Sequence, residues 1–99
     1  MLSHVVLFWL KPDLNPAQRE AFMAKVGTLA TIPGVVKCHI GTPASTDRPV
    51  IDRTYSVGLN LIFPDMAAHD AYQVHPTHLA FVESCKASWS KVLIYDFEG

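Results

Sequence analysis

The stretch from Leu2 to Leu10 is apolar on both faces of the strand that it predicts, and this feature constrains the fold most. Alternate side chains of a strand point to opposite sides. One face therefore carries His4, Val6, Phe8 and Leu10, and the other carries Val5, Leu7 and Trp9. A strand of this kind needs cover on both sides of its sheet.

Two helical regions follow from caps and prolines. Asn15 can cap a helix that begins at Pro16, with Gln18 reaching back to the cap. This helix is expected to run to about residue 30. A second helical region is expected to begin at residues 64–65, to break before Pro76 and to continue to about residue 87. The expected apolar stripes are Phe22, Val26, Leu29 and Ala30 in the first region, and Leu79, Val82, Lys86 and Trp89 in the second.

Three further strands are expected, at residues 35–40, 54–63 and 92–97. The segment between the first two, residues 41–53, has two prolines and little periodicity, so we interpret it as a long exposed loop. On the strand at 54–63, one face is expected to carry Tyr55, Val57, Leu59, Leu61 and Phe63.

The order β-α-β-β-α-β predicts an α+β, ferredoxin-like fold in which one four-stranded antiparallel sheet carries both helices on a single face. A chain of 99 residues is expected to form a single domain, residues 1–99.

The sheet face without helices is expected to be apolar, because the first and last strands place six large side chains there: Val5, Leu7, Trp9, Leu93, Tyr95 and Phe97. Burying each is worth roughly 1.5–3 kcal/mol, so their sum is comparable with the ~5–15 kcal/mol that stabilises a domain. A second copy is the simplest cover, which predicts an isologous homodimer through the sheet face, with a barrel-like centre. Ser56, Gly58 and Asn60 are small or polar on the same face, so water is expected in that part of the contact.

Composition argues against several classes of partner. Apolar residues make up 49% of the chain, charged residues only 17%, and the formal charge of −1 is scattered, so no basic stripe awaits a nucleic acid. The apolar run at residues 5–10 is too short to span a membrane and no leader precedes it, so we expect a cytoplasmic protein. Cys38 and Cys85 lack metal-ligand spacing and are expected to be buried thiols.

Two sequence runs give the chain a family resemblance: the opening Ser-His-Val-Val-Leu-Phe at residues 3–8, and Tyr-Gln-Val-His-Pro-Thr-His at residues 72–78. With the element order, they resemble the stress-responsive dimeric α/β-barrel (Dabb) family over nearly the whole length. The resemblance implies a ferredoxin-like dimer with a pocket between sheet and helices. Some plant members are cofactor-free polyketide cyclases that use a His as base and a Tyr as its polar partner for an aldol-type ring closure. Those roles fall here on His78 and Tyr72, with His4 as a further pocket residue.

The residues themselves are compatible with this chemistry. If Pro76 opens a helix, His78 lies in its first turn, where the positive end of the helix dipole favours a neutral ring. A neutral imidazole can accept a proton from an acidic carbon, and the Tyr72 hydroxyl can stabilise the enolate oxygen that results. The alternative is structural, with Pro76 and His78 locking a helix junction over Tyr72.

Other candidate residues have structural interpretations too. His75 is expected to cap the helix that follows it, and His4 can be a hydrogen-bonded core residue. No metal is expected, because the break at Pro76 separates His69 and His75 from His78. The residues expected beside an apolar small-molecule ligand are His4, Phe8, Phe22, Val57, Leu59, His75, Phe81, Trp89 and Ile94.

Two functions remain open at this point. One is a cofactor-free enzyme that performs acid–base chemistry on a small enolisable carbonyl compound. The other is a binding or stress-response protein that holds an apolar ligand unchanged. An open cavity containing the Tyr72 hydroxyl and a His78 nitrogen would favour the enzyme, and a filled core there would favour the structural interpretation.

Overall fold

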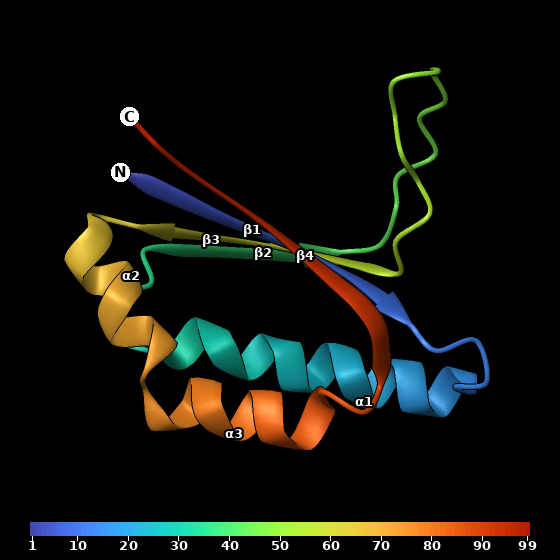
Figure 1. Ribbon diagram of the computed structural model, residues 1–99, viewed down its shortest axis with the longest axis horizontal. Helices are drawn as coiled ribbons and strands as arrows, with labels where there is room; N and C mark the ends of the chain where they lie inside the picture. Colours follow the sequence, from blue (N-terminus) through green and yellow to red (C-terminus); the bar gives the residue numbers. More distant parts are fainter.

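Four antiparallel strands form one sheet in the computed structural model, which describes residues 1–99. The strands are β1 (Leu2–Leu10), β2 (Lys37–Gly41), β3 (Val57–Phe63) and β4 (Trp89–Glu98). The helices are α1 (Pro16–Gly27), the 3-10 turn η1 (Thr28–Thr31), α2 (Met66–Gln73) and α3 (Pro76–Cys85). The strand order is β2-β3-β1-β4, and Figure 1 shows all helices on one side of the sheet. The expected α+β, ferredoxin-like fold is confirmed.

The helix starts follow the expected local rules. The Asn15 side chain accepts from the Gln18 backbone N–H, and the Gln18 side chain accepts from the Asn15 N–H, which completes a capping box. The break before Pro76 is present, and the His75 imidazole caps α3 by accepting from the Thr77 N–H. No helix has the length and apolar character needed to cross a membrane.

The core lies between the sheet and the helices. Alternate residues of β1 and β3 are buried on this side, and they pack against buried residues of all the helices. β1 is central, paired with β3 on one side and β4 on the other. The core residues include Val6, Phe8, Phe22, Val26, Leu59, Leu61, Phe63, Tyr72 and Phe81.

The third strand differs from the expectation, because it begins at Val57 instead of residue 54. Asp52 accepts hydrogen bonds from the Thr54 backbone and hydroxyl, which holds Thr54 in a turn. Tyr55 then lies against Trp9 on the sheet face without helices, with ring centroids 6.4 Å apart, and not on the helix side as expected. The turn chemistry therefore overrides the strand periodicity.

The helical stripes also need correction. α1 ends at Gly27 and tightens into η1, which buries Leu29 but leaves Ala30 exposed. In α3 the buried residues are Phe81 and Cys85, whereas Leu79 is 55% exposed. Leu79, Phe81 and Val82 point to different sides of α3, so the spacing of its apolar residues alone does not determine which side faces the core.

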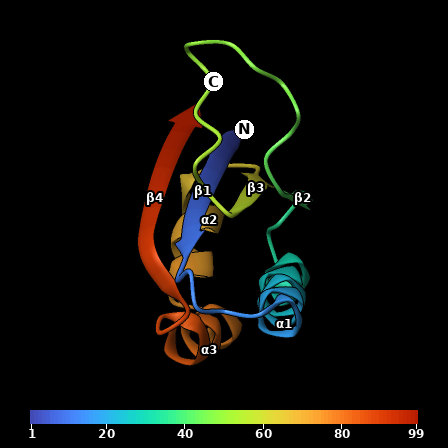
Figure 2. The same cartoon turned by 90° about the vertical axis from the view of Figure 1, so that its right-hand side faces the viewer.

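The last strand is longer than expected and begins at Trp89, which the sequence pattern wrongly places on a helical stripe. The sheet face without helices, here called the open face, is uncovered. Tyr95 and Phe97 of β4 are 56% and 63% exposed on it, opposite Val5 and Ser3 of β1. The loop between β2 and β3 rises from one end of the sheet on this side (Figures 1 and 2).

Candidate functional site

A pocket of about 160 Å³ lies between the sheet and the helices. Eight residues expected at a site line it: His4, Phe8, Leu59, Tyr72, His78, Phe81, Trp89 and Ile94. Ile94 and Val92 of β4 line it while partly exposed, so the pocket opens along this edge strand. An engineered cavity of about 150 Å³ in another protein holds benzene, so this space suits a compact ligand.

His78 is oriented by the backbone at the junction of α2 and α3. Its Nδ1 lies 3.0 Å from the Gln73 carbonyl oxygen. A carbonyl only accepts hydrogen bonds, so Nδ1 carries the proton and Nε2 has the lone pair of the neutral ring. Burial lowers the pKa of His78, against the opposing effect of the Gln73 carbonyl, and nearby His4 lowers it further. The side chain is therefore a neutral imidazole with a free basic nitrogen near pH 7.

Tyr72 lies between two histidines. Its ring centroid is 4.7 Å from that of His78 and 5.6 Å from that of His4, and the side chain is only 1% exposed. Burial raises the pKa of Tyr72 well above its ordinary value. The phenol therefore keeps its proton and can act as a hydrogen-bond donor.

His4 is held by Asp96 of β4, which is its register partner across the sheet. The His4 Nδ1 lies 2.5 Å from Asp96 Oδ1, so Nδ1–H donates to the carboxylate. Burial lowers the pKa of His4, and Asp96 opposes this. His69 approaches the other carboxylate oxygen of Asp96, with its Nε2 3.5 Å away. Asp96 thus orients a buried histidine at the edge of the pocket.

Three polar atoms of residues that line the pocket have no hydrogen-bond partner within the chain: Nε2 of His4, Nε2 of His78 and the Tyr72 hydroxyl. Only the Asn60 side-chain oxygen is both fully enclosed and without a partner. The three atoms are therefore not fully enclosed, and the residues that carry them line the pocket. A ligand carbonyl can meet a donor and two bases there.

Three of the expected residues do not line this pocket. Phe22 and Val57 are buried in the core, where Phe22 packs edge-to-face on Phe8 at 5.2 Å between centroids. His75 is used as the cap of α3. Sequence spacing placed Phe22 and Val57 on the helix side but could not distinguish core from cavity, whereas His75 has the capping role expected from the sequence.

Gln73 and Asp96 contribute to the site and were missed from the sequence. Gln73 acts through its backbone carbonyl, which no side-chain motif reveals. Asp96 is separated from His4 by 92 positions, and only their strand register brings them together. The sequence did contain one signal: Asp96 is the single acidic residue that alternates with Ile94 on the expected helix side of the last strand.

Asp96 also takes part in the one group of possible metal ligands. One ligand atom each from His4, His69 and Asp96 lie within 4.8 Å of one another. Two of these residues, His4 and Asp96, are already joined by a hydrogen bond. The group differs from the histidine set weighed from the sequence, because His69 on α2 lies beside Asp96 of β4.

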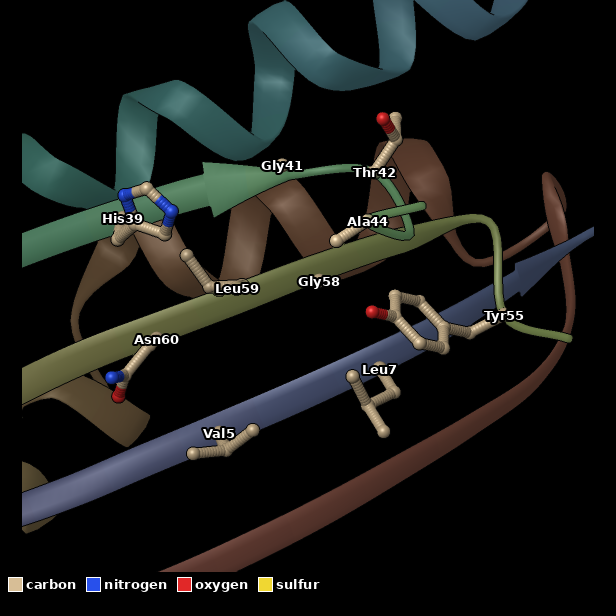
Figure 3. A pocket seen from close by; sticks show the side chains of 10 residues that line it. All are labelled: Val5, Leu7, His39, Gly41, Thr42, Ala44, Tyr55, Gly58, Leu59 and Asn60. Carbon is tan, nitrogen blue, oxygen red and sulfur yellow. The ribbon is translucent and has the colours of Figure 1, made fainter. Parts of the chain in front are cut away.

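A second cavity, of about 230 Å³, lies on the open face. Gly58 and Asn60 of β3 lie along its base, Val5 and Leu7 line one side, and Tyr55 overhangs one end (Figure 3). It is separated from the first pocket by the sheet, and none of the histidines of that pocket reaches it.

The chain matches one protein family and is similar to several known proteins. The profile of the family described as the stress responsive A/B barrel domain matches residues 2–99. Olivetolic acid cyclase from Cannabis sativa is 23% identical over 97 residues, covering 97% of this chain and 94% of the cyclase. A dimeric ferredoxin-like protein from Jannaschia sp. is 30% identical, with a TM-score of 0.78 and coverage of 99% and 98%. Hydroxynitrile lyase from Passiflora edulis is 21% identical, with a TM-score of 0.80 and coverage of 97% and 90%.

Proposed function

The chain belongs to the stress-responsive A/B barrel domain family, and on this premise we propose that it is a homodimer that removes a proton from a compact, apolar carbonyl compound. His78 is the general base, Tyr72 is the hydrogen-bond donor, and no cofactor takes part. The observation that carries the proposal is the Gln73 carbonyl, which fixes the proton on Nδ1 of His78 and leaves Nε2 free beside the pocket.

The chemical step uses the charge states derived above. His78 Nε2 takes a proton from the carbon next to the substrate carbonyl, and the bonding electrons move onto the carbonyl oxygen. The Tyr72 hydroxyl donates to that oxygen and stabilises its negative charge. The imidazolium that forms returns its proton when the enolate reacts or is reprotonated. His78 is therefore regenerated in its neutral form, and no other reagent is needed.

Pocket size and lining define the ligand class. Most lining residues are apolar, including Phe8, Phe81 and Trp89, and about 160 Å³ admits a single ring or a short chain. The polar atoms gather at Tyr72 and His78, so the carbonyl is expected to lie there with the apolar part against the aromatic rings.

The similar proteins support an enzymatic role. One is named a cyclase and another a hydroxynitrile lyase. The similar Jannaschia protein is described as dimeric, which supports self-association of this chain. The exposed apolar side chains of β4 on the open face, Tyr95 and Phe97, are the physical reason for a partner.

Deuterium exchange tests the base directly. The probe is phenylacetone, a compact enolisable ketone, dissolved in D₂O. Proton NMR follows the replacement of the hydrogens next to its carbonyl by deuterium, which reports proton removal from carbon. We expect catalysed exchange with the wild type, a loss of at least ~100-fold in His78→Ala, and a smaller loss in Tyr72→Phe. Glu83→Gln, on the exposed side of α3, is the matched control and should exchange like the wild type.

The same experiment distinguishes the alternative function. Ligand-observed NMR detects phenylacetone binding independently of exchange. Binding without catalysed exchange by the wild type would contradict the enzyme and support a ligand-holding protein, which the apolar lining also favours. Equal exchange by wild type and His78→Ala would remove His78 from the proposal.

A further inference from the structure

Three side chains that are far apart in the sequence meet under one end of the sheet: His4 of β1, His69 of α2 and Asp96 of β4. Figure 1 shows α2 beneath the end of the sheet where β1 begins and β4 ends. One possible ligand atom of each residue lies within 4.8 Å of the others. The spacing of the histidines at residues 69–78 predicts no metal, but strand register pairs His4 with Asp96, and α2 places His69 beside them.

The ring of His69 has one nitrogen oriented by a carboxylate and the other close to Asp96. Asp70 Oδ1 lies 3.2 Å from Nδ1 of His69 and can accept its proton. Nε2 of the neutral ring then carries the lone pair, and the flexible Gln73 side-chain amide, 3.2 Å away, can donate to it. Nε2 also lies 3.5 Å from Asp96 Oδ2. A nitrogen lone pair and a carboxylate oxygen therefore approach each other with no proton between them, which is the arrangement that a cation stabilises.

The distances in this group are close to those of a tetrahedral zinc site. Zn²⁺ binds histidine nitrogens and carboxylate oxygens at about 2.0–2.2 Å, which separates neighbouring ligand atoms by about 3.3 Å. The distance from His69 Nε2 to Asp96 Oδ2 is 3.5 Å, and that from His4 Nδ1 to Asp96 Oδ1 is 2.5 Å. A shift of Asp96 by less than ~1 Å makes both distances suitable. Its side chain is 37% exposed, so it has room to move.

We propose that His4 Nδ1, His69 Nε2 and the Asp96 carboxylate bind one Zn²⁺ ion, with a water from the exposed side of Asp96 as the fourth ligand. Two imidazoles and a carboxylate are a ligand set that zinc accepts, and three protein ligands leave one position for water. Asp70 is the carboxylate that orients a ligating histidine from behind. The group lies on the helix side of the sheet, so self-association through the open face leaves it accessible.

Zinc binding changes the hydrogen-bonding character of His4. Without the ion, Nδ1–H donates to Asp96 and Nε2 carries the lone pair. A ring that binds the ion through Nδ1 has its lone pair there, so the neutral ring carries its proton on Nε2. The proton leaves Nδ1 and one is taken up at Nε2 from water, so the charge of the ring does not change. The inference goes beyond the proposed function, because proton removal by His78 needs no ion.

Titration with Co²⁺, a coloured substitute for Zn²⁺, tests the site. The chain is used without an affinity tag, after treatment with EDTA and dialysis. Co²⁺ absorbs visible light only weakly when surrounded by six waters, and more strongly in a four- or five-coordinate protein site. We expect the stronger absorption to saturate at one ion per chain and to disappear when Zn²⁺ is added. No increase in absorption at millimolar Co²⁺, or an increase that Zn²⁺ does not reverse, would overturn the proposal.

Variants locate the ion. His69→Ala and Asp96→Asn each remove a ligand, so the dissociation constant for Co²⁺ should rise at least about 100-fold, and Asp70→Asn should raise it about tenfold. His39→Ala removes an exposed histidine of β2 and is the matched control. Cys38→Ala tests whether the half-buried thiol contributes. Both controls should bind like the wild type. Equal dissociation constants for His69→Ala and His39→Ala would overturn the proposal.

A measurement on the wild type keeps the test valid where a variant fails to fold. Proton–nitrogen NMR of the imidazole rings distinguishes the two tautomers, and His78→Gln helps to assign the signals. Without metal, both His4 and His78 are expected to carry the proton on Nδ1. With one equivalent of Zn²⁺, His4 should change to the Nε2–H form while His78 stays as it is. An unchanged His4 tautomer at saturating Zn²⁺, or a change at His78 instead, would overturn the proposal.

Discussion

Asp96 on β4 and His4 on β1 are joined by a hydrogen bond of 2.5 Å between Oδ1 and Nδ1, and this bond connects the solvent-exposed edge of the sheet to the buried side of the pocket. The carboxylate is 37% exposed, whereas the imidazole is 2% exposed. His4 therefore has its Nδ1 satisfied from outside while its other ring nitrogen faces the pocket beside Tyr72.

Asp96→Asn is expected to destabilise the protein by roughly 1–2 kcal/mol, because a charge-assisted bond to a buried ring is lost, with a discount for the partial exposure of the carboxylate. Urea unfolding measures the change. Asp70→Asn is the control: Asp70 contacts His69 at 3.2 Å, but its side chain is 68% exposed, so little change is expected. An equal decrease in the free energy of unfolding in both variants would show that the His4–Asp96 bond does not stabilise the protein more than an exposed contact does.

The stability should rise with pH between about 5.5 and 7.5. Burial lowers the pKa of both His4 and His78 below the ordinary value of 6.5, so the unfolded chain binds more protons than the folded chain in this range. The free energy of unfolding is then lost as the pH falls through 6.5 and levels off below the folded pKa values. Unfolding in urea at several pH values checks this, and His78→Gln should flatten the slope.

The pH dependence of catalysis should follow the same shift. General-base action requires neutral His78, so the exchange rate is expected to hold at pH 6.5 and to decline only at lower pH. Exchange measured across the pH range gives the midpoint of this acidic limb. A midpoint above 6.5 contradicts a buried neutral base.

Ile94→Trp should close the pocket without touching the polar atoms. Ile94 lines the pocket and is partly exposed on β4, so a larger ring there projects into the opening. Phenylacetone binding, measured by ligand-observed NMR, is expected to fall about tenfold or more. Val50→Trp in the exposed loop adds the same ring elsewhere and should leave binding intact. Unchanged binding by Ile94→Trp would place the ligand outside this pocket.

Two glycines are expected to respond in opposite ways to alanine. Gly34 has a φ of 95°, and a Cβ there would lie 3.2 Å from Ala68 Cβ, so Gly34→Ala should destabilise by ~1–2 kcal/mol. Gly27 ends α1 with open space around it, so Gly27→Ala should stabilise by ~0.5–1 kcal/mol. Thermal unfolding of the two variants provides the comparison. A change in stability in the same direction for both variants would contradict this prediction.

Local chemistry in the sequence determined the framework of this protein. The Asn15–Gln18 capping box, the helix break at Pro76 and the alternation along β1 depend on residues within a few positions of one another, and all were predictable. The cap formed by His75 was predictable for the same reason, because its acceptor role needs only the Thr77 N–H two residues away.

Tertiary structure alone decided which residues meet at the site. Strand register, set by the packing of the whole core, brings Asp96 to His4 and separates the pocket from buried Phe22 and Val57. The turn at Asp52 moved Tyr55 to the open face against the strand pattern. Such contacts depend on the relative placement of distant elements, whereas sequence periodicity specifies only the face on which a side chain lies.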